Sequence, residues 1–143
     1  MQIPVAQHTA TQVLAGTYQY DVFVGGGRNG GPQRTLQRYN RATATWSTYG
    51  WVGDWRMAHT ATLLADNRTI LFVGGMGLSG VLANAYAINT DSGASTSSTF
   101  PASVPGIESH AAQIVATNPS TVLVTGGDNG AYTSIYNTSL LYQ

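Results

Sequence analysis

Short runs of β-branched and aromatic residues alternate along the whole chain with clusters of Gly, Asn, Asp, Ser and Pro. In the first third of the chain the runs are residues 8–11, 22–26, 36–40 and 43–47. Runs of this length, bounded by turn-forming residues, predict β-strands. No stretch keeps apolar residues at helical spacing over two full turns. The pattern therefore predicts an all-β chain with no helix.

The pattern repeats about every 50 residues. Three segments open with histidines at intervals of 51 positions, His8, His59 and His110, and in each segment an apolar run then ends in two glycines. Four antiparallel strands in a unit of this length is the size of a β-propeller blade. We therefore divide the chain, residues 1–143, into blade repeats of about 1–51, 52–103 and 104–143 that form a single propeller segment. The third repeat ends before its fourth strand.

Two stretches connect these repeats to a known family. One is Arg-Met-Ala-His-Thr-Ala-Thr-Leu-Leu at residues 56–64, completed by Val-Gly-Gly at 73–75, and the other is the Tyr-Asn strand that precedes Trp46. Together they resemble the kelch repeat, and the resemblance covers almost the entire chain, with departures at Ile88, Phe100 and Ala111. It implies a kelch-type β-propeller segment of three four-stranded antiparallel blades, the last lacking its outer strand. It implies no single function, because enzymes, lectins and protein-binding modules share this scaffold.

The glycines and the histidines of the repeats suggest a dinucleotide site and a metal site, but the repeat pattern supports neither. Residues 25–30 match G-x-G-x-x-G, but the dinucleotide site needs a helix after the motif, and the glycine pair recurs in every repeat. We therefore predict that these glycines serve strand bends and close backbone approach. The three histidines could ring a central channel, but neighbouring blades diverge too far for a shared zinc ion. Each histidine is expected instead to hydrogen-bond a loop backbone, and we predict no metal or other cofactor.

The composition narrows the functional classes. Charged residues make up 8% of the chain, the net charge is zero, and the cations are all arginine. This balance argues against a nucleic-acid surface. Without cysteine the chain has no disulfide and no thiol chemistry, and it cannot form the cysteine–tyrosine thioether of the copper radical oxidases found among kelch propellers. The longest apolar runs span about five residues, so no membrane insertion is expected. The absence of lysine and abundant Ser and Thr favour an extracellular or particle surface.

The segment that links the first two repeats carries the densest set of candidate binding residues. It contains Tyr49, Trp51, Asp54, Trp55 and Arg56. Two indoles beside a carboxylate and a guanidinium suit either sugar stacking or a protein hot spot. The alternative is that one tryptophan packs under the linking loop. Trp46 and Phe100, on the outermost strands of their repeats, are expected to pack between blades.

The blade topology places further loop residues on the same face. These candidates are Arg28, Asn29, Asp128, Asn129 and Tyr132. We predict a non-catalytic module that binds a glycan or a protein partner through this face. No catalytic residue is assigned, although Asp54, Glu108 and Asp128 remain as carboxylates for a hydrolytic pair.

Two other functional classes stay open. The chain could be part of a larger propeller enzyme whose catalytic residues lie outside it, or a structural subunit of a filament or shell. Propellers typically have four to eight blades. Three repeats cannot close a ring, so either further blades from another copy or chain are expected, or the chain is a piece of a longer propeller.

Overall fold

The computed structural model describes residues 1–130, 134–136 and 139–142, and within these ranges the regular structure is all strand. The strands are β1 (Thr9–Gln12), β2 (Val22–Gly25), β3 (Gln33–Asn40), β4 (Thr45–Arg56), β5 (Thr60–Leu63), β6 (Thr69–Val73), β7 (Met76–Gly77), β8 (Gly80–Val81), β9 (Asn84–Asn89), β10 (Ser95–Thr99), β11 (Ala111–Thr117), β12 (Ser120–Thr125) and β13 (Ser139–Tyr142). The described residues include no helix long and apolar enough to cross a membrane.

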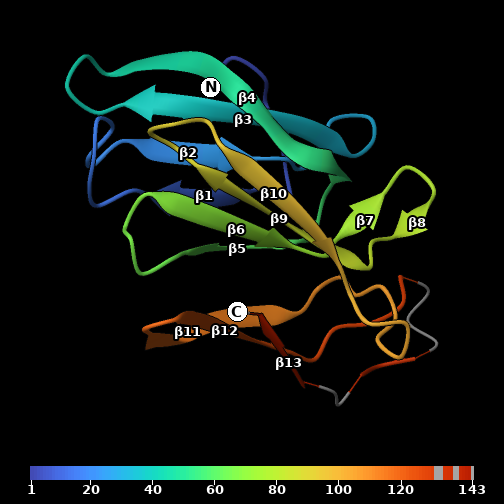
Figure 1. Cartoon of the computed structure of the whole chain (residues 1–143). Helices are drawn as coiled ribbons and strands as arrows, with labels where there is room; N and C mark the ends of the chain where they lie inside the picture. Colours follow the sequence, from blue (N-terminus) through green and yellow to red (C-terminus); the bar gives the residue numbers. More distant parts are fainter. Residues whose placement is uncertain (131–133, 137–138, 143) are drawn as a thin grey trace.

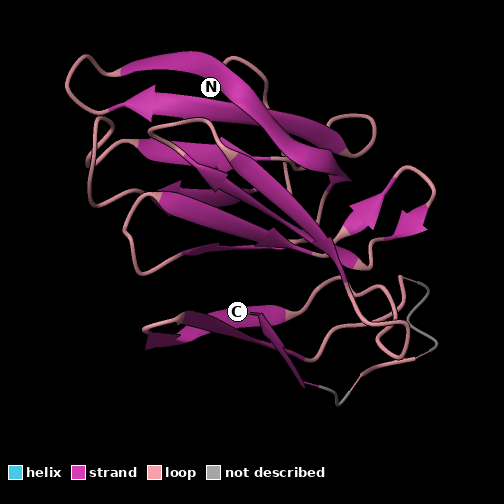
Figure 2. Cartoon of the chain, viewed as in Figure 1, coloured by secondary structure: helices cyan, strands magenta, loops and turns pink. Residues whose placement is uncertain are grey.

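The strands form three antiparallel sheets and one small hairpin (Figures 1 and 2). The orders are β1-β2-β3-β4, β5-β6-β9-β10 and β11-β12-β13, and β7 pairs with β8. None of these sheets closes on itself within the described ranges. The predicted all-β fold is confirmed, as are sheets of four, four and three strands with a glycine pair at the end of the second strand in each. The β7–β8 hairpin was not predicted, because strands of two residues leave no alternating pattern.

The sheets lie in a row, with one hydrophobic core in each interval (Figure 1). Strand β6 lies in the middle sheet and serves both cores. Its Ile70 and Phe72 pack toward the first sheet, whereas Leu71 and Val73 pack toward the third. All four are buried, because side chains alternate across a strand and this strand is covered on both faces. The buried partners in the first core are Val13, Phe23, Leu36, Val52 and Ile88, and those in the second are Ala85, Ile107, Val122 and Val124.

A repeated backbone joint connects consecutive repeats. The amide of Gly27 donates to the carbonyl of Arg56 at 2.8 Å, and the amide of Gly75 donates in the same way to Ile107. The preceding glycines of the two pairs have positive φ, and a side chain on Gly26 would lie 2.6 Å from the Arg56 carbonyl oxygen. The glycine pairs are therefore needed where one repeat meets the backbone of the next, as predicted.

The histidines bond differently from the expectation. Nε2 of His59 lies 2.9 Å from Oγ1 of Thr9, and Nε2 of His110 lies 2.8 Å from Oγ1 of Thr60. The prediction of a bond to a loop backbone is therefore wrong for these two rings, which reach a threonine side chain of the preceding repeat. Strand β5 contacts β1 on one side and β11 on the other, and this brings the hydroxyl within reach of the imidazole.

The outer-strand aromatic residues pack unequally. Phe100 packs against the core between the second and third sheets, as expected. Trp46 joins neither core; it is half-buried and contacts Tyr39 of its own sheet with ring centroids 5.1 Å apart. The expectation that Trp46 packs between blades is therefore wrong. The neighbouring sheet is reached by Tyr49 and Val52, because β4 continues well beyond Trp46.

Candidate functional site

The segment expected to be a linking loop is part of a long strand. β4 runs from Thr45 to Arg56, and β3 pairs with it up to Trp51 and again at Arg56; between these points the register is irregular, with Arg34 alone opposite residues 52–55. The linking-loop expectation is therefore wrong, because the segment is part of a strand, although Gly53 in its irregular part has a φ of 77°. β4 contacts β9 of the second sheet and the short strand β7, so its residues border the second repeat.

Two indoles are exposed on this strand and share one guanidinium. Trp51 is 52% exposed and Trp55 is 37% exposed. The Arg34 guanidinium carbon, from β3, lies 4.5 Å from the centroid of Trp51 and 5.3 Å from that of Trp55. Cation–π contacts of this kind restrict both rings. The sequence placed Arg34 on the same face as the tryptophans without naming it a binding residue, and the packing of β3 beside β4 brings its guanidinium to both indoles.

A row of three clefts follows β4, and together they form what we term the β4 groove. The central cleft, of about 610 Å³, lies between β4 and the β9–β10 hairpin, and its lining includes Asp54, Asn84 and Tyr86. A cleft of about 430 Å³ on one side includes Trp51 and again Tyr86. A third, of about 320 Å³, includes Trp55 and again Asp54. The shared residues make the three clefts neighbours, with an exposed indole in each outer cleft.

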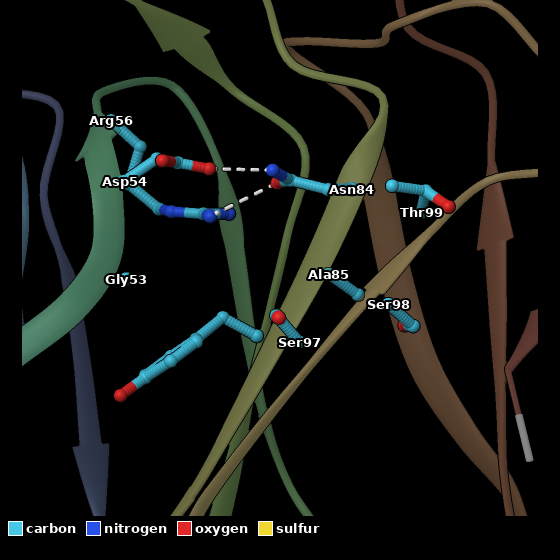
Figure 3. A pocket seen from close by; sticks show the side chains of 9 residues that line it. Gly53, Asp54, Arg56, Asn84, Ala85, Ser97, Ser98 and Thr99 are labelled. Atoms are coloured by element: carbon cyan, nitrogen blue, oxygen red, sulfur yellow. Dashed lines mark hydrogen bonds between the residues drawn. The ribbon is translucent and has the colours of Figure 1, made fainter.

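A hydrogen-bonded chain of side chains lines the central cleft (Figure 3). Nη2 of Arg56 donates to Oδ1 of Asn84 at 3.1 Å, and Nδ2 of Asn84 donates to Oδ2 of Asp54 at 2.5 Å. Figure 3 shows both β4 side chains meeting the same amide from β9, with Ser97, Ser98 and Thr99 of β10 beyond it. The amide is thereby held in one orientation, and it holds the Asp54 carboxylate in place.

Arg56 has a structural role in this row of hydrogen-bonded side chains. Its side chain is fully buried, and Nη1 donates to the Gly74 carbonyl at 3.0 Å. Burial lowers the pKa of the guanidinium to about 10, and the nearby Asp54 carboxylate opposes that shift. The sequence placed Arg56 among the ligand-binding residues; the structure places it at the border of the central cleft with its side chain fully buried. Asp54 is exposed and remains accessible.

Tyr49 supports one end of the β4 groove from the core. Its ring packs edge-on against Phe23 and Tyr18, and its hydroxyl donates to the carbonyl oxygen of Thr90. Burial raises the pKa of the phenol, with smaller contributions from Tyr18 and Asp91. The side chain therefore remains neutral and structural at physiological pH, although it also borders the cleft that contains Trp51.

The other candidates lie away from the β4 groove. Arg28 and Asn29 are exposed between β2 and β3, where the backbone of Arg28 pairs with Ala6. Asp128 is buried, and its Oδ1 accepts from the Gly130 amide at 2.7 Å, while Asn129 is half-buried. None of these four lines the three clefts. Tyr132 lies outside the described residues.

The three candidate carboxylates are not gathered at one cleft. Glu108 and Asp128 face each other across a backbone bridge in the third repeat, and both are buried. Burial raises the pKa of Glu108, and the Asp128 charge raises it further. Asp54 lies in the β4 groove, apart from this pair. No group of three metal-ligating side chains comes together in the described part of the chain.

The groove residues Asn84, Tyr86, Ser97 and Thr99 were not anticipated from the sequence. They belong to β9 and β10, two ordinary strands of the second repeat, and only the packing of the second sheet against β4 brings them to the candidate site. No sequence motif marks them. In comparisons with protein-family models and with curated proteins, the chain matches none.

Proposed function

We propose that the chain is a segment of a kelch-type β-propeller. The repeat resemblance is supported by three antiparallel sheets arranged in a row, each joined to the next by the same glycine-to-carbonyl contact. Gln7, Ala58 and Ser109, which precede the three histidines, share a positive φ of 52 to 54°. First strands β1, β5 and β11 are neighbours, as the inner strands of consecutive blades would be.

The segment acts as a non-catalytic binding module for a glycan or a protein partner. The observation that carries this proposal is the exposed pair Trp51 and Trp55, held beside Arg34 at the β4 groove. Exposed indoles give large contact area at a low ordering cost, and tryptophan and arginine are the residues most often found at binding hot spots. The low-charge, lysine-free composition is the basis for proposing an extracellular or particle surface as its location.

Substitution of the tryptophans tests this proposal. The purified chain is screened on a glycan array and against proteins captured from culture supernatant, and the ligand found is titrated against Trp51→Ala, Trp55→Ala and Trp46→Ala. We expect the first two to weaken binding by about 2 kcal/mol or more. Trp46→Ala, on the same strand but outside the three clefts, is the matched control and should bind normally. Normal binding by all three variants would show that the site lies elsewhere.

A second candidate function is assembly with further blades. Gly126 corresponds to Gly26 and Gly74, yet a side chain there would meet no described atom within 4 Å. On the third sheet, Val115 is 54% exposed and Leu141 is 57% exposed, unlike the buried residues of the middle sheet. A further repeat, from another copy or another chain, would cover this surface.

Light scattering tests the assembly proposal. The chain has a mass of 15.1 kDa, and self-assembly predicts a multiple of that mass. Leu141→Arg should reduce the measured mass, because a charge would be buried in the contact. A wild-type chain that remains a monodisperse monomer would exclude self-assembly.

A further inference from the structure

Most of the residues that line the central cleft of the β4 groove carry a polar group in their side chains. On the β9–β10 hairpin Asn84 pairs with Thr99, and Tyr86 with Ser97, so these side chains share one face of the hairpin. Ala85 is the one aliphatic residue of the lining, and it is buried. A cleft of about 610 Å³ is within the usual size range of small-molecule sites. Hydroxyl, amide and carboxylate groups beside the apolar face of the Tyr86 ring suit a hydroxyl-rich ligand.

The central cleft carries an exposed negative charge. Asp54 is exposed at the centre, and Arg56, the cation that also borders this cleft, is buried. A second carboxylate, Asp91, lines the cleft beside Trp51 and is paired with Arg68 at 3.4 Å. The exposed charge in the central cleft is therefore the Asp54 carboxylate, which repels carboxylate or sulfate groups on a ligand at this point, whereas the exposed Arg34 guanidinium lies beside the indoles of the outer clefts.

The polar side chains of the central cleft are held in place by contacts within the protein. The side-chain hydrogen bonds from Arg56 to Asn84 and from Asn84 to Asp54 use one oxygen of the Asp54 carboxylate. The second oxygen of this carboxylate can therefore accept a hydrogen bond from a ligand hydroxyl. Tyr86 is held by close backbone approach at Gly53, where a side chain would lie 2.8 Å from the tyrosine ring. Preorganised polar and aromatic groups of this kind reduce the ordering cost of binding.

We infer that the β4 groove is a binding site for a neutral oligosaccharide. Asp54 and Asn84 bind the hydroxyls of a central sugar, Tyr86 contacts its ring, and Trp51 and Trp55 contact the sugars on either side. The inference rests on the proposed function as a binding module and names its ligand class and its central contacts. Among the described residues Asp54 is the one carboxylate that lines the central cleft, whereas glycoside hydrolysis generally needs two, so the proposed role is binding of the saccharide without cleavage.

Calorimetric titration with defined oligosaccharides tests this inference. The probes are hexasaccharides of glucan, mannan, xylan, galactan and chitin, together with oligogalacturonate as the acidic counterpart. At least one neutral probe should bind, and oligogalacturonate should bind at least about ten-fold more weakly. Asn84→Ala and Tyr86→Ala should each weaken the neutral interaction about ten-fold or more. Asp54→Asn should also weaken binding of the neutral probe, and it should reduce the difference in affinity between the neutral probe and oligogalacturonate. Ser47→Ala, exposed on β4 outside the groove, is the matched control.

The outcomes separate this inference from the proposed function. If the chain binds a protein, and Trp51→Ala impairs that binding while Tyr86→Ala does not, the binding module stands and the saccharide site is overturned. If none of the neutral probes binds, or oligogalacturonate binds as well as they do, the ligand class is wrong. If neither a saccharide nor a protein binds, both proposals fail. Thermal melts of each variant confirm that a loss of binding is not a loss of fold.

Discussion

Oγ1 of Thr9 lies 2.9 Å from Nε2 of His59, and the same pair one repeat later, Thr60 and His110, is 2.8 Å apart. Each bond crosses from the first strand of one repeat to the start of the next. Burial lowers the pKa of His59 to about 3, with the Arg56 charge adding to the shift, and lowers that of His110 to about 4. Both imidazoles are therefore neutral at pH 7, and each shares a hydrogen bond with a hydroxyl.

The threonine–histidine bonds should contribute measurably to stability. Thr9→Val and Thr60→Val preserve side-chain shape but remove the hydroxyl, and we expect each to lower the free energy of unfolding by about 1 to 2 kcal/mol. Thr11→Val, on the same strand as Thr9 but outside these pairs, should change it by less than about 0.5 kcal/mol. Urea unfolding at pH 7 measures the three values. Equal values for Thr9→Val and Thr11→Val would contradict the assigned role.

The buried histidines should make the fold sensitive to mild acid. Their folded pKa values lie below the unfolded value of about 6.5, so the unfolded chain binds more protons as the pH falls. Their contribution is complete above pH 6.5 and decreases as the pH falls toward 4 and 3. The loss approaches about 1.4 kcal/mol per pH unit for each histidine below pH 6.5, and it ends at a higher pH for His110, whose folded pKa is higher. Urea unfolding between pH 7 and 5 measures the slope, and His59→Gln should reduce it.

The glycines at the repeat joint should differ in their tolerance of a side chain. Gly26 and Gly126 both have positive φ, so alanine costs about 1 to 2 kcal/mol at either position through backbone strain. At Gly26 the new methyl group would also collide with the Arg56 carbonyl oxygen and with the ring of His59, raising the cost to about 3 kcal/mol or more. Thermal and urea unfolding of Gly26→Ala and Gly126→Ala give the comparison. A similar loss of unfolding free energy in both variants would mean that the backbone around Gly26 moves to accommodate the new side chain.

Arg56 should matter for folding more than for ligand contact. Arg56→Leu leaves the Asn84 side-chain oxygen and the Gly74 carbonyl without these donors, and we expect a loss of about 2 to 4 kcal/mol of stability. Arg28→Ala, at an exposed loop position, should cost less than about 0.5 kcal/mol. Differential scanning calorimetry of the two variants distinguishes these values. An Arg56→Leu chain that melts like the wild type would show that the buried guanidinium is dispensable.

The candidate site could be predicted only in part. Trp51, Trp55 and Asp54 were found because aromatic and charged side chains are concentrated in one short segment. Arg56 belongs to the same segment but is buried, which spacing along the chain cannot reveal. Asn84 and Tyr86 carry no local signal; they join the site because β9 lies across from β4 in the folded chain.

The sequence by itself determined the strands of the three larger sheets apart from the extent of β4, the repeat pattern and the positions of the glycine pairs, because these depend on local alternation and on turn residues. Tertiary structure alone decided that β4 extends through the expected loop, that Tyr49 and Val52 rather than Trp46 reach the neighbouring sheet, and that His59 bonds to Thr9. Each of these outcomes depends on which strand faces which across a distance of many residues. Which strands come to face one another is decided by backbone pairing and by side-chain burial between sheets. The order of residues within one strand does not determine it.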